Sequence, residues 1–177
     1  VVNGLSAEQA ERATTVVNAV TPVNMAGPVI SVVPAGRSGD RYMVDVFVQG
    51  VPDIRSYQVT MMAGGGDSGT LQLEDVRIDS ARPEYVFGSS QTVTANSPMT
   101  GKLAAVLYDG TAAALKPAYL GTMTFRASPD AAGTFRVNVE VGPDSIVATG
   151  DNKEVGYSVG ADARIVVGPT RTGRDDK

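Results

Sequence analysis

Apolar and polar residues alternate with a period of two through most of this sequence, and this rhythm limits the fold more than any other feature. Between residues 41 and 48, every second residue from Tyr42 is apolar, as in a strand with one buried side. Further candidate strands, separated by turn residues, occupy 29–33, 54–62, 70–79, 103–108, 119–127, 135–141 and 163–167. About nine short strands in an unbroken series predict an all-β, antiparallel β-sandwich of the jelly-roll type.

Local features refine this prediction. The apolar phase slips by one residue between Leu73 and Val76, which predicts a β-bulge near Glu74–Asp75. Tyr85–Phe87 and Gln91–Ala95 are weaker strand candidates. The glycine-rich stretch 64–69 formally matches a dinucleotide fingerprint, but a strand follows it where that motif requires a helix. The stretch therefore predicts a flexible hairpin loop.

The two ends of the chain lack the period of two. Residues 6–9 have the form of a capping box, and Ala and Val then recur at helical spacing, which predicts a short helix over 6–20 within an N-terminal arm, 1–27. The apolar stripe of this helix suits either packing on the domain or contact with a partner, and its candidate partner-binding residues are Val16, Val17 and Val20. Residues 28–168 form the predicted sandwich, and 169–177 a flexible C-terminal tail.

The sequence contains no His and no Cys among its 177 residues. It therefore lacks the commonest general base, the thiolate nucleophile and the strongest transition-metal ligands. Its 19 Asp and Glu residues fall mostly in turns or at outward strand positions, where a solvated carboxylate is the ordinary case. These observations favour a non-catalytic module without a cofactor over a hydrolase.

Several binding classes are also disfavoured. The formal net charge of −4 argues against nucleic acid, which needs a basic face. No apolar run approaches the roughly 18 residues of a membrane-spanning helix. Trp is absent and the Tyr residues are scattered, so carbohydrate binding is a less favoured alternative. Calcium needs several oxygen ligands, and candidates lie in one long connection: Asp144, Asp151, Asn152 and Glu154.

Five stretches of the sequence resemble the bacterial cohesin family. They are 42–54, 56–61, 71–79, 101–109 and 120–135. The best-matching stretch is LGTMTFRA at Leu120–Ala127 with AGTF at Ala132–Phe135, which is similar to a signature of the family. The resemblance implies a nine-stranded jelly roll that attaches to other proteins, as cohesins bind a dockerin through one sheet face.

The first expectation is therefore an exported, non-catalytic protein-binding module of the cohesin type, with a dockerin-like partner. The alternative is an accessory or structural subunit of a larger extracytoplasmic, membrane-associated or surface assembly. The N-terminal arm and the long connections at 111–117 and 144–156 favour this alternative, because they are not cohesin features. Strands rich in Thr, Ser and Gly, with few Lys, favour a location in the periplasm or at the cell surface.

Overall fold

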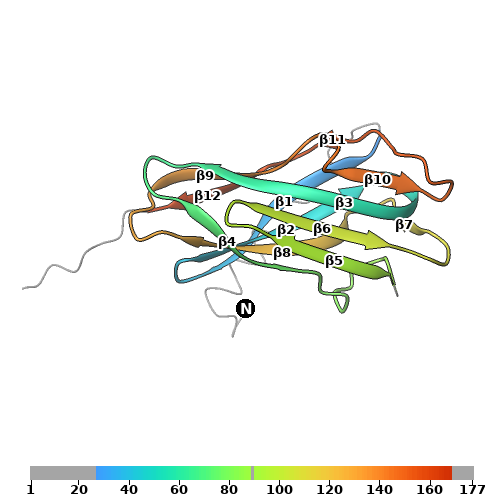
Figure 1. Ribbon diagram of the computed structural model, residues 1–177, viewed down its shortest axis with the longest axis horizontal. Coiled ribbons are helices and arrows are strands. Elements are labelled where there is room, and N and C mark those ends of the chain that lie inside the picture. Colours follow the sequence, from blue (N-terminus) through green and yellow to red (C-terminus); the bar gives the residue numbers. More distant parts are fainter. Residues whose placement is uncertain (1–26, 89, 169–177) are drawn as a thin grey trace, which may run out of the picture.

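The computed structural model describes residues 27–88 and 90–168, which form two β-sheets packed face to face (Figure 1). Sheet A has the strand order β11-β1-β2-β8-β4, and sheet B has the order β12-β9-β3-β6-β5, with β7 and β10 also paired to β3. The strands are β1 (Val29–Ser38), β2 (Arg41–Gln49), β3 (Val51–Gly65), β4 (Leu71–Arg77), β5 (Gln91–Asn96), β6 (Thr100–Val106), β7 (Ala112–Ala114), β8 (Ala118–Ala127), β9 (Gly133–Val139), β10 (Ile146–Thr149), β11 (Ser158–Val159) and β12 (Ala163–Val167).

The predicted all-β sandwich is confirmed. Of the 12 strands, only β7, β10 and β11 are shorter than five residues, which leaves the nine longer strands that the sequence predicts. Only one strand pair among the described residues is parallel, that of β1 with β11. The bulge expected near Glu74–Asp75 is also present, because the pairing of β4 with β8 shifts between Leu73 and Asp75.

The core between the sheets is built from every second residue of the facing strands. Val44 and Val46 of β2 are fully buried, and so are Val59 and Met61 of β3. Phe125 of β8 is fully buried as well and adds the largest apolar area of this set. Burial of these alternating side chains supplies most of the driving force for folding.

One strand prediction was wrong. Tyr85–Phe87 is not a strand but part of the connection that leads from β4 in sheet A to β5 in sheet B. Phe87 is buried in the core, where its ring centroid lies 4.9 Å from that of Tyr57 and 5.4 Å from that of Tyr85. The apolar triplet therefore reflects the burial of Phe87 in the core and not a strand. The other weak candidate, Gln91–Ala95, corresponds to β5.

The predicted ends of the chain lie outside the described residues. These are the helix at 6–20, with Val16, Val17 and Val20, and the tail at 169–177. Both stay predictions. Within the described residues, no helix has the length and apolar character needed to cross a membrane.

β3 is the central strand of sheet B and pairs along both of its edges. One edge meets β6 and then β7, and the other meets β9 and then β10. The connection 140–145 separates β9 from β10. Across this gap the backbone N–H of Thr60 donates to the hydroxyl of Ser145 at 3.0 Å, so a side chain replaces the missing backbone partner. β9 and β10 thus act as one interrupted strand.

The glycine-rich turn at 64–69, predicted as a flexible loop, is held by hydrogen bonds. The backbone N–H of Gly66 donates to the carbonyl of Thr134 at 2.9 Å, and that of Asp67 to the carbonyl of Ala132 at 2.7 Å. These bonds arise because the start of β9 lies alongside the turn. The chain can make this close approach because its glycines adopt positive φ angles, +83° at Gly66 among them.

We expect Gly69→Ala to lower the free energy of unfolding by about 1–3 kcal/mol. Gly69 has a φ of +68°, and a Cβ there would lie 2.5 Å from the backbone of Ala131. Gly64→Ala is the matched control, since no atom lies within 4 Å of its would-be Cβ and its φ is not positive. Urea unfolding of both variants tests this, and equal stabilities would contradict it.

Candidate docking surface

The exposed apolar side chains avoid the strands of sheet A. Among the described residues, the exposed large apolar side chains are Met62, Val86, Val93, Met99, Val106, Tyr108, Leu115, Val141 and Val166. Met62, Val93, Val106 and Val166 lie on strands of sheet B, and the others lie in connections. Because apolar side chains grouped on one face of a domain mark interaction sites, sheet B carries the candidate site.

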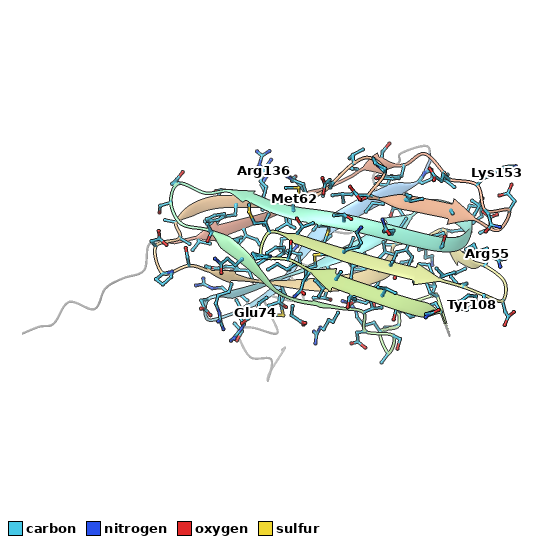
Figure 2. The ribbon with its side chains drawn as sticks, viewed as in Figure 1. Arg55, Met62, Glu74, Tyr108, Arg136 and Lys153 are labelled. Carbon is cyan, nitrogen blue, oxygen red and sulfur yellow. The ribbon has the colours of Figure 1, made fainter. Side chains whose placement is uncertain are left out.

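The outward-facing side chains of β3, β5 and β6 form the centre of this surface, called here the outer face of sheet B. Strand register places Val93, Ala104 and Gln58 in one row across the three strands. The next row contains Gln91, Val106 and Ser56. Figure 2 shows this face toward the viewer, with Met62 and Arg136 left of its centre and Arg55 and Tyr108 toward its right-hand end.

The middle of the outer face is polar and internally bonded. The carbonyl of Asp144 accepts hydrogen bonds from the hydroxyl of Thr60 at 2.8 Å and the side-chain amide of Gln58 at 3.2 Å. The carboxylate of Asp144 lies 3.8 Å from the ammonium nitrogen of Lys102. The connection 140–145 therefore rests against the face and fixes these polar groups, while Val93 and Val106 stay open beside them.

The four calcium candidates do not come together. Asp144 faces Lys102, whereas Asp151 lies beyond β10, where its carboxylate accepts from the hydroxyl of Thr149 and pairs with Lys153, both at 2.6 Å. The hydrogen bond from Lys153 holds the pKa of Asp151 below its usual value. Asn152 lies in the turn that follows β10 and has a φ of +60°. The backbone of Glu154 forms an isolated antiparallel β-bridge with that of Ala148. No three potential metal-ligating residues group together in the described ranges, and the calcium site stays a prediction.

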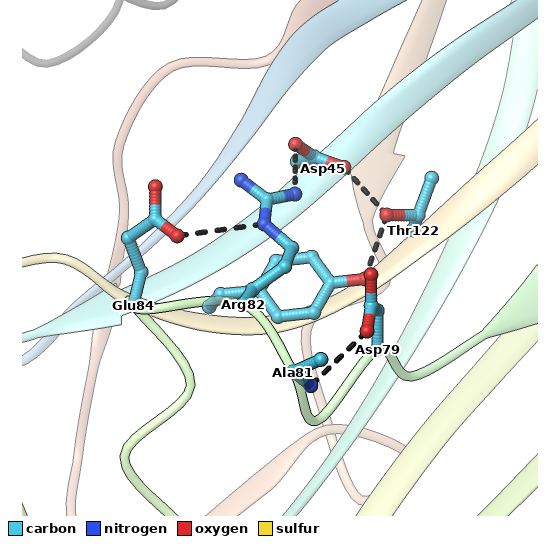
Figure 3. Close-up of polar contacts among 7 residues, drawn as sticks. Asp45, Asp79, Ala81, Arg82, Glu84 and Thr122 are labelled. Carbon is cyan, nitrogen blue, oxygen red and sulfur yellow. Dashed lines mark hydrogen bonds and ion pairs between the residues drawn. The ribbon is translucent and has the colours of Figure 1, made fainter.

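The outer face of sheet A is covered by a connection that a partly buried ion pair holds in place (Figure 3). Arg82, from the connection between β4 and β5, donates to the carboxylate of Asp45 on β2 at 2.6 Å. Its guanidinium lies 4.1 Å from the ring centroid of Tyr119 and 5.8 Å from that of Phe47. The remaining oxygen of Asp45 accepts from Thr122 at 2.6 Å. The connection is thus fastened across the sheet.

The carboxylates around Arg82 stabilise its charged form and so help to hold the connection against sheet A. Burial alone would lower the pKa of Arg82, but its hydrogen bond to Asp45 and the nearby carboxylates outweigh that cost and raise the pKa. Burial raises the pKa of Tyr119, whose hydroxyl shares a 2.7 Å hydrogen bond with Thr122. All four polar side chains therefore have partners, and this face offers no open apolar surface beneath Arg82.

The rim of sheet A is covered by surface ion pairs. Glu74 lies 2.5 Å from Arg41 and 2.8 Å from Arg126, and Arg126 also lies 3.4 Å from Asp40. The hydrogen bond from Arg41 lowers the pKa of Glu74. Asp40 and Arg126 also line an open groove of about 810 Å³ at this end of the sandwich. Because Asp40 and Arg126 pair with each other and Arg37 lies over the ring of Tyr42, this groove is a weaker candidate than the outer face of sheet B.

Sequence comparisons find no relatives: no protein-family model matches the chain, and no curated protein matches it significantly. Solved structures do match. A non-cellulosomal cohesin from the archaeon Archaeoglobus fulgidus aligns with 16% identity and a TM-score of 0.57, over 80% of this chain and 93% of that one. The sixth cohesin of scaffoldin B from Acetivibrio cellulolyticus, in complex with a Cel5 dockerin, aligns with 15% identity and a TM-score of 0.60, over 77% of this chain and 96% of that one.

A third match is the OlpC cohesin of Clostridium thermocellum in its type I cohesin–dockerin complex. It aligns with 12% identity and a TM-score of 0.56, over 80% of this chain and 95% of that one. In each case nearly the whole of the matched domain is covered by this chain. The resemblance predicted from the sequence is therefore confirmed at the level of architecture, and the chain has the fold of a cohesin domain.

Proposed function

We propose that this chain is a non-catalytic protein-binding module, that a dockerin-type module is its partner, and that the outer face of sheet B receives it. The fold supports the class of function, because several of the solved cohesins that it matches are in complexes with dockerins. The observation that carries the choice of face is the contrast between the two sheets. Sheet A is closed by Arg82 and Asp45, whereas sheet B exposes Val93 and Val106.

The chemistry of this face suits a partner that also exists unbound. Val93 and Val106 supply apolar area, and Gln58, Thr60 and Lys102 add polar groups between them. Interfaces between separately folded proteins have this mixed composition. The polar groups are held in place by Asp144, so less side-chain freedom is lost on binding.

The proposal includes the absence of catalysis and a location outside the cytoplasm. The lack of His and Cys in the sequence supports the first, because it removes the commonest general base and the thiolate nucleophile. Strands rich in Thr, Ser and Gly support the second. Calorimetric screening against glycosides and esters tests the first point, and a turnover that an acid-to-amide substitution abolishes would contradict it.

We expect Val106→Glu to weaken dockerin binding at least tenfold, since a carboxylate would be desolvated in the apolar part of the interface. The measurement is isothermal titration calorimetry against a panel of purified dockerin modules that includes the Cel5 dockerin. Val86→Glu is the matched control, because Val86 is an equally exposed valine, at 41%, that lies off the sheet. Equal affinities for the two variants would contradict the choice of face, and failure of every dockerin to bind wild-type protein would contradict the partner.

A further inference from the structure

β5 is the outermost strand of sheet B, at the lower border of the sheet in Figure 1. It pairs with β6 over six residues with no shift of register, and all six of its residues are exposed. Its sequence, QTVTAN, contains no charged residue, no Pro and no Gly. In the part of the chain that the structure describes, its second edge meets no other strand, so backbone N–H and C=O groups there are free to pair.

The other sheet edges carry protection that β5 lacks. β4 contains Glu74, Asp75 and Arg77 and is bulged. β11 has only two residues, and the short β12 has Arg164 near its start. Charges, bulges and shortness are the usual means by which edge strands avoid pairing with another chain. β7 and β10, which among the described strands pair only with β3, have three and four residues. A longer edge that is unbulged and neutral, beside these short, bulged or charged edges, indicates that pairing at β5 is tolerated or used.

We propose that β5 pairs antiparallel with β5 of a second copy of this chain, about a two-fold axis perpendicular to sheet B. With the axis at Val93, this residue lies opposite Val93 of the partner subunit, and Thr92 lies opposite Thr94 of the partner subunit. Such pairs of β-branched side chains stabilise antiparallel strands. On a two-fold axis a residue meets its own counterpart, so a charged residue there would face a like charge, and the neutrality of β5 removes this repulsion.

The compositions of the two ends of the chain make them poor candidates for the strand that pairs with β5, and this favours a second copy of the chain. The segment 6–20 has the apolar spacing of a helix. The segment 169–177, PTRTGRDDK, contains Pro, Gly and five charged residues, which are depleted in strands. Neither end has the alternation that a strand added to β5 would need. The proposal does not depend on the docking function, because the two-fold contact uses the strand edge.

Sedimentation equilibrium of the full chain over a concentration series, with no dockerin present, tests this contact. Wild-type protein should form a reversible dimer, and Val93→Lys should raise the dimer dissociation constant at least tenfold, because two ammonium groups would meet at the axis. Val166→Lys is the control: it changes an exposed valine, at 68%, on the edge strand β12 of the same sheet, and it should dimerise like wild type.

Mixing two variants makes the test independent of folding. Val93→Lys and Val93→Glu should each be mostly monomeric alone, and an equimolar mixture should recover at least the wild-type degree of dimerisation, because opposite charges then meet. Wild-type protein that stays monomeric throughout the series would overturn the proposal. So would a Val93→Lys variant that dimerises as tightly as wild type.

Discussion

Phe125→Ala should lower the free energy of unfolding by about 3–5 kcal/mol, through lost apolar burial and the cavity left behind. Phe125 is fully buried on β8, between Tyr42 of β2 and Leu73 of β4. Backbone pairing on both sides holds β8 in place, so the strand cannot collapse into the space. Phe135→Ala should cost a similar amount, because the ring of Phe135, only 1% exposed, lies against Gly66.

Chemical denaturation followed by circular dichroism measures this loss. Phe125→Leu is the matched control, because it keeps most of the apolar volume and should cost less than about 1.5 kcal/mol. A Phe125→Ala variant that unfolds at the wild-type urea concentration with an unchanged slope would show that the core is assigned wrongly.

Asp45→Ala should cost about 3 kcal/mol, because breaking a largely buried ion pair leaves Arg82 with only the more distant carboxylate of Glu84, at 3.5 Å. The substitution would remove the closest acceptor of Arg82 and the carboxylate acceptor of Thr122, whose hydroxyl would keep only its hydrogen bond with Tyr119. Since the side chain of Arg82 is 23% exposed, water can reach it, which places the expected cost at the lower end of the usual range for buried pairs.

A double-mutant cycle separates this interaction from simple loss of packing. Arg82→Ala should also destabilise the protein, because it removes the cover over Phe47 and Tyr119. The combined Asp45→Ala and Arg82→Ala variant should lose less than the sum of the two single losses. Strict additivity of the unfolding free energies would mean that the two side chains do not stabilise each other.

The sandwich was predictable because its information is local. In each strand the apolar residue at every second position marks the buried side, so the core positions of β2 and β3 follow from the sequence alone. The bulge near Glu74–Asp75 follows from a slip in the same pattern, and the predicted closing strand at 163–167 has the bounds of β12. None of these elements requires information about contacts between residues far apart in the sequence.

The closure of sheet A was not predictable, because it depends on residues far apart in the chain. Phe47 stands at an outward position of β2, and the alternation places it on the polar face. It is nevertheless only 7% exposed, because Arg82 covers it and is anchored to Asp45, 37 residues earlier. A single arginine in an irregular connection has no periodic pattern, so the sequence gives no sign of this contact.

The site residues predicted from the sequence were Val16, Val17 and Val20 of the arm and Asp144, Asp151, Asn152 and Glu154 of the long connection. The predicted partner-binding residues do not include Val93 or Val106 of the candidate docking surface, although the sequence contains a signal for it. The segment 103–108 is apolar in both phases of its alternation, LAAVLY, and the structure places Leu103 inside and Val106 outside. A strand that is apolar on both faces, in a sheet with one face open to solvent, indicates a contact surface.

The central position of β3 has a consequence for how the protein is made. β3 pairs with β10 through Gln58 and Ile146, and β12 completes sheet B only at Ala163–Val167. A ribosome that has made β3 must therefore add the segments of three later strands, β9, β10 and β12, before this side of the sheet can form. Until then the apolar side of β3 has no complete cover, and contacts between such distant segments form slowly. Sheet B therefore cannot be completed until the segments of β9, β10 and β12 have been made and have assembled beside β3.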